Sequence, residues 1–489
     1  MTRGDAKPRV NGTPTLEHHG IEHIPAAERH GKPWHQLTLW FSSNVTMTAV
    51  VTGAVAVALG LDLKWAIATI AIGNLVGGVF MAYHSVQGPE LGVPQMVQSR
   101  AQFGFFGGAL PSFIVVLMYL GFTVEGSLVG GEALAGWLGV SKALGIVIFG
   151  AAHGLVALVG YKLIHSMARY ITVVSAIVFL ALFVQLATHL PQHLPNSGSP
   201  ATAGTVMLAI SISISWQVTW APYVSDYSRY LPEDTPRKAT FWYTYLGSAV
   251  GGSIAMAIGA MAADVNSNAL NTDAIGFLAH RFPAISGLLV FALLVISIPS
   301  GAEGPYGAFL STLSIFSRRT EPRSPVLGRA LFVIGFTVVG AVLAILSSGS
   351  MLNTFTNITL FLLYLLVPWT AINLTDYYVV RRGHYDVSAL FDPNGRYGRW
   401  NWGAMLLYVV SFAAEVPFIN SSLYVGPLAN LLGGADIAWL IGLAVGGFGY
   451  YALARQTHLC TAGTGVQTAT ETAPGLPARH TGPAEASSR

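Results

Sequence analysis

The stretch SISISWQVTWAPYVSDYSRYLP, residues 211–232, begins as an apolar helix and is then interrupted by Gln217 and Pro222. Proline removes a backbone donor and clashes with the preceding turn, so we expect the helix to break here. A second apolar run, WFSSNVTMTAV at residues 40–50, is crowded with hydroxyl and amide side chains. Irregular backbone at membrane depth survives only where it is buried in protein or lines a cavity. Paired interruptions of this kind are typical of secondary transporters, whose binding sites lie near the bilayer midplane.

The composition places the whole chain in a membrane. Of 489 residues, 53% are hydrophobic and only 10% are charged, whereas soluble proteins carry about 25% charged residues. Runs of roughly 20 apolar residues recur, and at ~1.5 Å of rise per residue each can cross a hydrocarbon core of ~30 Å. We therefore predict an all-α membrane protein with twelve transmembrane helices. The expected spans are residues 38–60, 64–84, 108–136, 142–160, 167–187, 203–224, 238–261, 284–315, 327–346, 352–378, 402–424 and 435–454.

The positions of lysine and arginine predict the orientation, because cytoplasmic segments of membrane proteins are enriched in these residues. With both termini in the cytoplasm, all but Lys64, Lys142 and Arg281 of the 25 basic residues fall on the cytoplasmic side. The net charge of +3 thus follows from topology and does not indicate nucleic-acid binding. We expect an integral protein of a cell membrane, either a plasma membrane or a bacterial inner membrane.

The two ends of the chain are polar. Residues 1–37 lack the apolar core of a cleaved signal peptide, so we expect a cytoplasmic N-terminal segment. Residues 455–489 are too poor in apolar side chains to form a core and predict a disordered cytoplasmic tail. The tail holds the only cysteine, Cys460, which matches no metal-ligand spacing. Nothing in the sequence indicates an obligatory protein partner.

Several classes of function lack the residues that they need. The chain has no G-x-x-x-x-G-K-[ST] phosphate loop and no H-E-x-x-H zinc motif. A membrane-embedded enzyme would need a nucleophile with a base or a metal cluster, and His153 and the scattered serines do not supply that spacing. A non-transporting sensor would need a signalling domain, for which the loops are too short. We therefore expect a transporter without cofactor or metal site, driven by an ion gradient, and not an enzyme.

Four stretches carry a resemblance to a known family. They are IEHIPAAERHGKPWHQLTLWF, GPELGVPQMVQSRAQFG, WAPYVSDYSRYLP and NLTDYYVVRRGHYDVSALFDPNGRYGRWNW, beginning at residues 21, 88, 220 and 373. The chain resembles the nucleobase:cation symporter family, within it the purine/cytosine permease branch. The resemblance implies a leucine-transporter-like fold with two inverted five-helix repeats, residues 38–187 and 203–378, plus two additional helices within residues 402–454. A planar heterocycle would bind between helices one, three, six and eight.

The resemblance also implies where the substrate binds. The aromatic residue on which the base stacks corresponds to Phe122 on helix three, and its partner on helix six is Trp216 or Trp220. Gln217 and Asn44 are further candidates for contact with the base. Relatives place amides four residues after the helix-three aromatic and in an N-x-x-N-x-Y pattern on helix eight. This chain has Gly126 at the first place, and Gly301, Gly304 and Tyr306 along the second.

A glutamate precedes each of two glycines at these places, Glu125 before Gly126 and Glu303 before Gly304. An ionised carboxylate only accepts hydrogen bonds, so it suits a base with adjacent N–H groups or a cationic ligand. Adjacent positions on a helix differ by about 100°, so Glu125 need not face the site and is alternatively a hydrogen-bond partner between helices. The prolines and glycines around Glu303 also predict irregular backbone in helix eight. Of two other membrane carboxyls, Glu415 lies outside the ten-helix core and is expected to be structural. Glu132 lies near the outer end of its helix, where a structural and a functional role are both open.

The sequence says less about the coupling ion than about the fold or the substrate site. Sodium-coupled relatives use backbone carbonyls of helix one and hydroxyls of helix eight, and here those hydroxyl positions hold Ala302 and Glu303. We take Glu303, Ser300 and Ser43 as the candidates for cation coupling, with protons favoured over sodium. The expected function is import of a nucleobase or similar planar heterocycle by cation symport. The alternatives are a vitamin-like or cationic heterocycle of the pyridoxine or thiamine-precursor type, and sodium-coupled nucleobase uptake.

Overall fold

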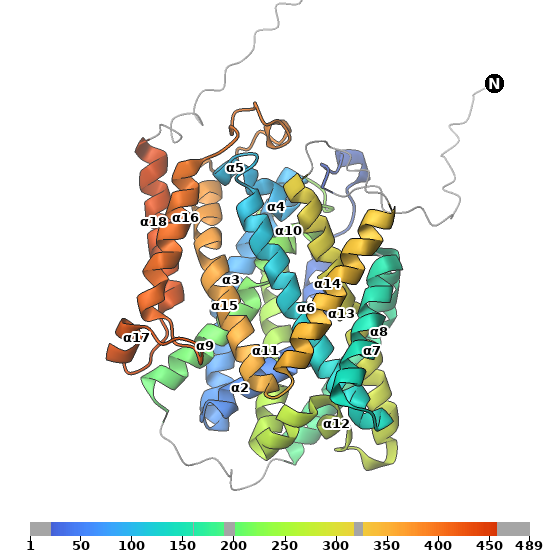
Figure 1. Cartoon of the computed structure of the whole chain (residues 1–489). Helices are drawn as coiled ribbons and strands as arrows, with labels where there is room; N and C mark the ends of the chain where they lie inside the picture. The colour runs from blue at the N-terminus through green and yellow to red at the C-terminus, as the bar shows by residue number, and fades with distance from the viewer. Residues whose placement is uncertain (1–20, 160, 190–200, 317–325, 457–489) are drawn as a thin grey trace, which may run out of the picture.

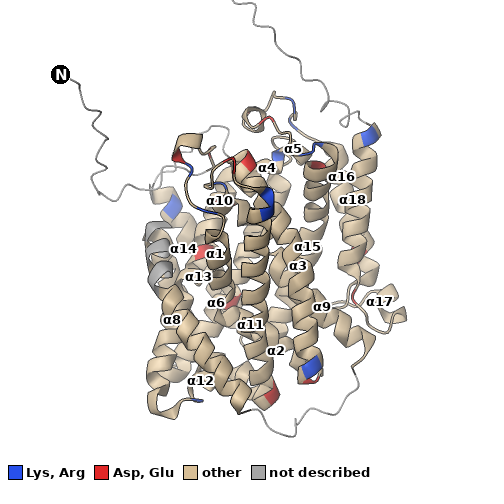
Figure 2. Ribbon diagram, turned by 180° about the vertical axis from the view of Figure 1, so that it is seen from behind, with Lys and Arg blue, Asp and Glu red and all other residues tan. Residues whose placement is uncertain are grey.

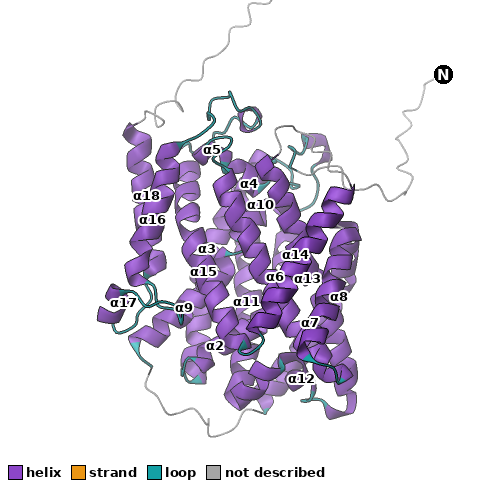
Figure 3. Cartoon of the chain, viewed as in Figure 1, coloured by secondary structure: helices purple, strands orange, loops and turns teal. Residues whose placement is uncertain are grey.

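The computed structural model describes residues 21–159, 161–189, 201–316 and 326–456. The first part of the N-terminal segment and almost all of the predicted tail, including Cys460, lie outside these residues. Over the described residues the chain is a bundle of helices (Figure 3), with a single isolated bridge between Asn420 and Val425.

The longer helices run roughly along one axis (Figure 1). They are α1 (His35–Asn44), α2 (Met47–Ala58), α3 (Leu63–Leu91), α6 (Ala109–Leu138), α7 (Lys142–Val159), α8 (Tyr161–Thr188), α9 (Ala203–Val218), α11 (Arg237–Thr272), α13 (Ser286–Phe316), α14 (Val326–Ser347), α15 (Met351–Leu374), α16 (Trp402–Glu415) and α18 (Ala438–Gln456). Short helices join them: α4 (Gln95–Gln98), α5 (Arg100–Phe103), α10 (Val224–Ser228), α12 (Ala274–Ala279) and α17 (Pro427–Leu431). Single turns are η1 (Ala26–Glu28), η2 (Ala221–Tyr223), η3 (Pro283–Ile285), η4 (Thr375–Val380), η5 (Ser388–Leu390) and η6 (Val416–Phe418).

The number of spans agrees with the prediction. Among the described residues, nine helical segments are long and apolar enough to cross a membrane, and the bent pair α1 and α2 makes a tenth span. The helices α16 and α18 pack against each other and against α15 at one edge of the bundle (Figure 1). With these two, the fold contains the twelve helices that the apolar runs predict.

Both predicted helix breaks are confirmed. The chain bends by 60° between α1 and α2, and the Thr46 hydroxyl caps α2 by accepting a hydrogen bond from the Ala49 N–H. In the sixth span α9 ends at Val218, and the 3-10 turn η2, which contains Pro222, separates it from α10. Each break leaves the ends of two short helices inside the protein rather than one continuous helix.

The irregular backbone predicted for helix eight is wrong. The helix α13 runs from Ser286 to Phe316 with Pro299 and Pro305 inside it. Transmembrane helices tolerate proline because neighbouring helices and small backbone adjustments satisfy the freed groups. The glycines of α13 have a different role, since a Cβ atom on Gly304 would overlap the Thr123 side chain of α6. They allow α6 and α13 to approach closely.

The core helices form two closely packed groups. The first group contains α1, α2, α3, α9 and α11, and the second contains α6, α7, α13 and α14. Within the first group, a Cβ on Gly53 of α2 would overlap the backbone of Met256 on α11. Within the second, a Cβ on Gly131 of α6 would overlap Ile146 on α7. Small residues at such positions let helix backbones approach in the way that membrane helices favour.

Charged residues lie mainly at one end of the bundle. Lysine and arginine gather near α4, α5 and α10 (Figure 2), with few at the opposite end near α12 and the start of α3. The first described residues and the end of α18 lie at that same basic end (Figure 1). This arrangement agrees with a topology in which both termini face the same side.

Candidate functional site

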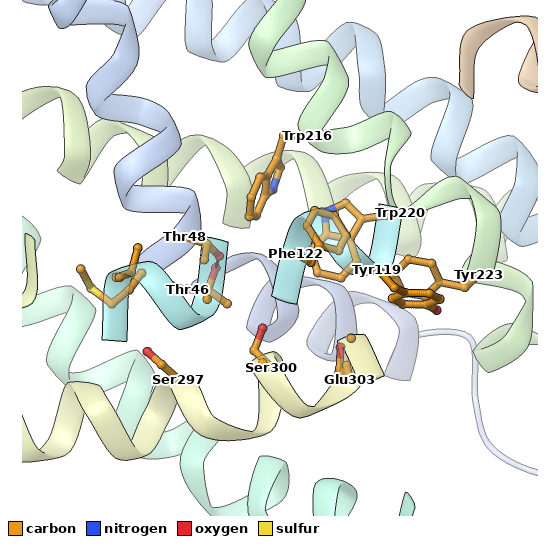
Figure 4. Close-up of a pocket in the computed structure, with 15 residues that line it drawn as sticks. Thr46, Thr48, Tyr119, Phe122, Trp216, Trp220, Tyr223, Ser297, Ser300 and Glu303 are labelled. Atoms are coloured by element: carbon orange, nitrogen blue, oxygen red, sulfur yellow. Dashed lines mark hydrogen bonds between the residues drawn. The ribbon is translucent and has the colours of Figure 1, made fainter. Parts of the chain in front are cut away.

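A cavity of about 650 Å³ lies between the two groups of helices, beside both helix breaks. Its walls come from the start of α2, the middle of α6, the end of α9 with η2, and the middle of α13 (Figure 4). These are the first, third, sixth and eighth spans, which are the four that the sequence predicts for a substrate site. The cavity is lined by Thr46, Met47, Thr48, Tyr119, Phe122, Gly126, Val129, Trp216, Trp220, Tyr223, Ser297, Ser300, Gly301, Glu303 and Gly304.

Aromatic rings form one wall of this cavity. The Phe122 ring lies 6.3 Å from the Trp220 ring at an interplanar angle of 34°, and 6.5 Å from the Trp216 ring at 57°. A planar ring held between two parallel rings needs about 7 Å, because carbon atoms pack at ~3.5–4.0 Å. Both distances are shorter than this and fall in the range of rings in direct contact, ~4.5–7 Å. The three rings therefore form one aromatic surface, on which a planar substrate can stack from the cavity side. The buried Trp220 Nε1–H has no partner among the described residues and is a donor available beside the cavity.

Trp216 is fixed by a buried polar network behind the cavity. Its indole N–H donates to Asn44 Oδ1 at 2.7 Å, and Asn44 Nδ2 donates to the Ser248 hydroxyl at 2.9 Å. Gln217 Nε2 donates to Asn74 Oδ1 at 2.7 Å, while Gln217 Oε1 accepts from the Ser248 hydroxyl at 2.6 Å. These contacts join α1, α3, α9 and α11, all of the first group of helices.

Asn44 and Gln217, the further candidates for contact with the base, lie in this network. Neither residue lines the cavity, and both are fully buried with their amides occupied by protein partners. Gln217 follows Trp216 directly, so the helix turns its amide about 100° away from the face that Trp216 presents. Both residues position Trp216 and the broken helices.

Glu125 also lies outside the cavity, whereas its neighbour Gly126 lines it. The Glu125 carboxyl is buried and faces Thr359 of α15, and its Oε1 has no partner among the described residues. The geometry agrees with the alternative that Glu125 lies between helices. Glu125 lies one position before Gly126, so its side chain points about 100° away around the helix axis and misses the cavity.

Glu303 borders two cavities. It lines the aromatic cavity and also a second one of about 490 Å³. The second cavity is bounded by Ser42 and Ser43 at the end of α1, by Thr172 and Ser175 on α8, and by Ser300 and Glu303 on α13. The structure thus brings together Ser43, Ser300 and Glu303, the three residues proposed for cation coupling. Figure 4 shows Ser300 and Glu303 pointing from α13 towards the aromatic residues.

The two other membrane carboxyls lie away from both cavities. Glu132, near the end of α6, accepts a hydrogen bond from Lys142 Nζ at 2.9 Å. Glu415 on α16 is buried beside Gly442 of α18, and neither of its oxygens has a partner among the described residues. Their positions agree with structural roles rather than substrate contact.

Sequence reasoning missed several lining residues. Tyr119 precedes Phe122 by three positions and therefore lies on the same face of α6, which is a signal that helical spacing carries. Tyr223 follows Pro222 in the broken segment. Both tyrosines lie near Glu303 at one end of the cavity (Figure 4).

Comparison with known proteins agrees with this geometry. Residues 23–442 match the family described as permease for cytosine/purines, uracil, thiamine, allantoin. The chain belongs to this permease family. It is 40% identical over 447 residues to the Bacillus subtilis protein named "Putative purine-cytosine permease YxlA", covering 90% of this chain and 96% of that protein. It is 25% identical to the purine-cytosine permease fcyB of Emericella nidulans over 453 residues, which is 90% of this chain and 88% of that one.

The fold is shared with a solved transporter. The permease superposes with a TM-score of 0.69 on Mhp1, a nucleobase-cation-symport-1 family transporter, in a closed conformation with bromovinylhydantoin bound. The match covers 89% of this chain and 96% of Mhp1 at 19% sequence identity. The family assignment and the leucine-transporter-like fold predicted from the sequence are both confirmed. The permease is an integral membrane protein.

Proposed function

We propose that the permease imports a nucleobase of the purine or cytosine type, or a closely related planar heterocycle, across a cell membrane. The observation that carries the proposal is the cavity itself, which is lined by the rings of Phe122, Trp216 and Trp220. Stacking on an aromatic face suits every base, because each has a π-surface. The Trp220 N–H and the hydroxyls of Ser297 and Ser300 supply polar groups along the cavity wall.

Transport is coupled to protons through Glu303 in this proposal. Among the described residues that line the two cavities, Glu303 is the only acidic one, and it borders both. A titratable group between a substrate cavity and a second cavity is suited to link proton binding to substrate binding. Intramembrane carboxyls commonly mark proton relays in transporters.

Alternating access follows from the position of the cavity at the boundary between two helix groups. One wall belongs to the group of α2 and α9, and the other to the group of α6 and α13. Movement of one group against the other would open the cavity to each side in turn, as rigid-body models of such transporters describe. We assign the basic end, with both termini, to the cytoplasm because of its lysine and arginine content.

A sodium-coupled mechanism is the second candidate. The second cavity is lined by the hydroxyls of Ser42, Ser43, Thr172, Ser175 and Ser300, and sodium, a hard cation, prefers oxygen ligands. A vitamin-like or cationic heterocycle remains the alternative substrate, supported by the thiamine in the family description and by the carboxyl of Glu303 in the cavity.

The test replaces Glu303 by glutamine, which keeps size and hydrogen bonding but cannot titrate. We expect Glu303→Gln to lose uptake driven by an inward proton gradient in proteoliposomes, while exchange of labelled for unlabelled base persists. Wild-type uptake should collapse with a protonophore and be unaffected when choline replaces sodium. Glu415→Gln is the matched control, since this buried carboxyl lies outside both cavities. Sodium-dependent wild-type uptake, or full accumulation by Glu303→Gln, would refute the proton assignment.

A further inference from the structure

His153 lies on α7, behind the cavity wall formed by α6 and α13. Its side chain is fully buried, and neither Nδ1 nor Nε2 has a hydrogen-bond partner among the described residues. The ring packs edge-on against Phe149 at 4.6 Å. A buried polar group without a partner costs about 1–3 kcal/mol, so a histidine with two such atoms needs an explanation.

The imidazole occupies the space that two cavity-lining glycines leave open. A Cβ atom on Gly301 of α13 would overlap the His153 ring. A Cβ on Gly126 of α6 would lie 3.5 Å from its Cε1 atom. Both glycines line the cavity, whereas His153 lines neither cavity, so the ring lies directly behind the glycine backbones.

These two glycines have no side chain of their own to offer a substrate at this part of the cavity wall. An amide offers both a donor and an acceptor, and a neutral imidazole does the same with its two nitrogens. The chain therefore holds a donor and an acceptor directly behind the two glycines. Ser127 Oγ and Thr337 Oγ1 are also buried without a described partner and lie beside Gly150 and Gly154 of the same helix, α7. A hydroxyl on one ring nitrogen would set which tautomer faces the cavity.

We propose that His153 determines the substrate specificity of this permease by hydrogen bonding an edge of the heterocycle that reaches past the backbones of Gly126 and Gly301. The ligand class is a planar heterocycle with a ring nitrogen or N–H group on the edge that faces α7. This inference rests on the proposed function, because it concerns the same cavity. It adds the fourth span to the third and eighth spans that line the cavity.

The test measures binding of a panel of bases to the full-length permease in detergent. The panel pairs purines and pyrimidines with analogues in which single ring nitrogens are replaced by carbon. His153→Phe retains an aromatic ring against Phe149 and removes both nitrogens. We expect it to weaken the best ligand by about 5- to 150-fold, the effect of leaving a buried polar partner unsatisfied. The analogue that lacks the ring nitrogen facing α7 should bind the His153→Phe variant and the wild type with almost the same affinity.

A reciprocal exchange tests whether the side chains at positions 153 and 301 compete for one space beside the cavity. Gly301→Asn alone should abolish binding, because its side chain overlaps the His153 ring. The double variant His153→Ala/Gly301→Asn should recover binding to within a few-fold of wild type, since the amide then fills the vacated space. Non-additivity of this kind is expected for residues in contact, and the specificity role itself is read from the analogue panel.

His84→Phe is the matched control. This histidine is also fully buried, has an Nε2 atom without a described partner and stacks on Trp369 at 4.6 Å, but it lines neither cavity. The His84→Phe variant should keep the wild-type order of ligand affinities even if its thermal stability is lower. His153→Gln provides a second variant if His153→Phe does not fold.

The outcomes distinguish the two levels of the proposal. A wild-type permease that binds no base or related heterocycle refutes the proposed function, and the role of His153 falls with it. A wild-type protein that binds bases, together with a folded His153→Phe variant whose affinities for the whole panel are unchanged or uniformly lowered, overturns the specificity role alone.

Discussion

Replacing Trp216 by alanine should weaken substrate binding by about 5- to 150-fold, because base stacking on an aromatic ring contributes roughly 1–3 kcal/mol. The Trp216 ring lines the cavity and lies 5.9 Å from Trp220 and 6.5 Å from Phe122. Its removal takes away one aromatic wall. Phe122→Ala should act in the same direction, since Phe122 faces both tryptophans.

A second substitution separates the ring from its anchor. Trp216→Phe keeps an aromatic face but loses the N–H that donates to Asn44 Oδ1 at 2.7 Å. Asn44 Oδ1 retains only the longer contact from Gln217 Nε2 at 3.4 Å. The loss of a typical hydrogen bond, ~0.5–1.5 kcal/mol, predicts a smaller loss of affinity, about 2- to 13-fold.

The assay is equilibrium binding of labelled base to purified protein, with size-exclusion profiles to establish folding. Trp137→Ala is the matched control, because Trp137 is half exposed on α6 and lines neither cavity. It should leave the dissociation constant unchanged. A folded Trp216→Ala variant with wild-type affinity would show that the ring does not stack on substrate. If Trp216→Phe is as damaging as Trp216→Ala, then the hydrogen bond to Asn44 matters more than the aromatic face.

Two further predictions concern stability. Gly53→Ala places a methyl group against the backbone of Met256 and should lower the midpoint of thermal unfolding, since overpacking costs typically about 1–3 kcal/mol. Gly335→Ala is the control and should leave the midpoint unchanged, because its Cβ would meet nothing within 4 Å. Equal midpoints for the two variants would contradict the close packing of α2 and α11. Arg381→Met removes the donor that pairs with buried Asp376 at 3.0 Å and should destabilise the protein by up to about 3–5 kcal/mol. The neighbouring Arg382→Met, at an exposed position, is the control, and a similar effect of both would argue that the ion pair contributes nothing.

The features predicted correctly from the sequence are those set by local chemistry. Pro222 and the polar residues around Thr46 break apolar runs wherever those runs fold, so both interruptions could be located before the structure was known. The lining position of Phe122 and Trp216 came from the family pattern. These predictions need only the order of residues along one helix.

The features that could not be predicted depend on what neighbouring helices supply. Glu125 and Gln217 each lie one position from a cavity residue, and the 100° turn between adjacent positions takes them away from it. The backbone around Pro299 remains helical because neighbouring helices and small backbone adjustments satisfy the groups that proline leaves without a hydrogen bond. The place of His153 could not be inferred, because no spacing within α7 tells which glycines of α6 and α13 lie opposite.

The position of Glu303 between two cavities has a thermodynamic consequence. If occupancy of one cavity alters the affinity of the other by some factor, the second must alter the first by the same factor. A cation that tightens base binding on the side where it is abundant would necessarily be bound more tightly by the loaded carrier. On the side where that cation is scarce, the empty second cavity would loosen the base and favour its release. The direction of net flux would then depend on the two concentrations outside the protein and not on any asymmetry within its binding site.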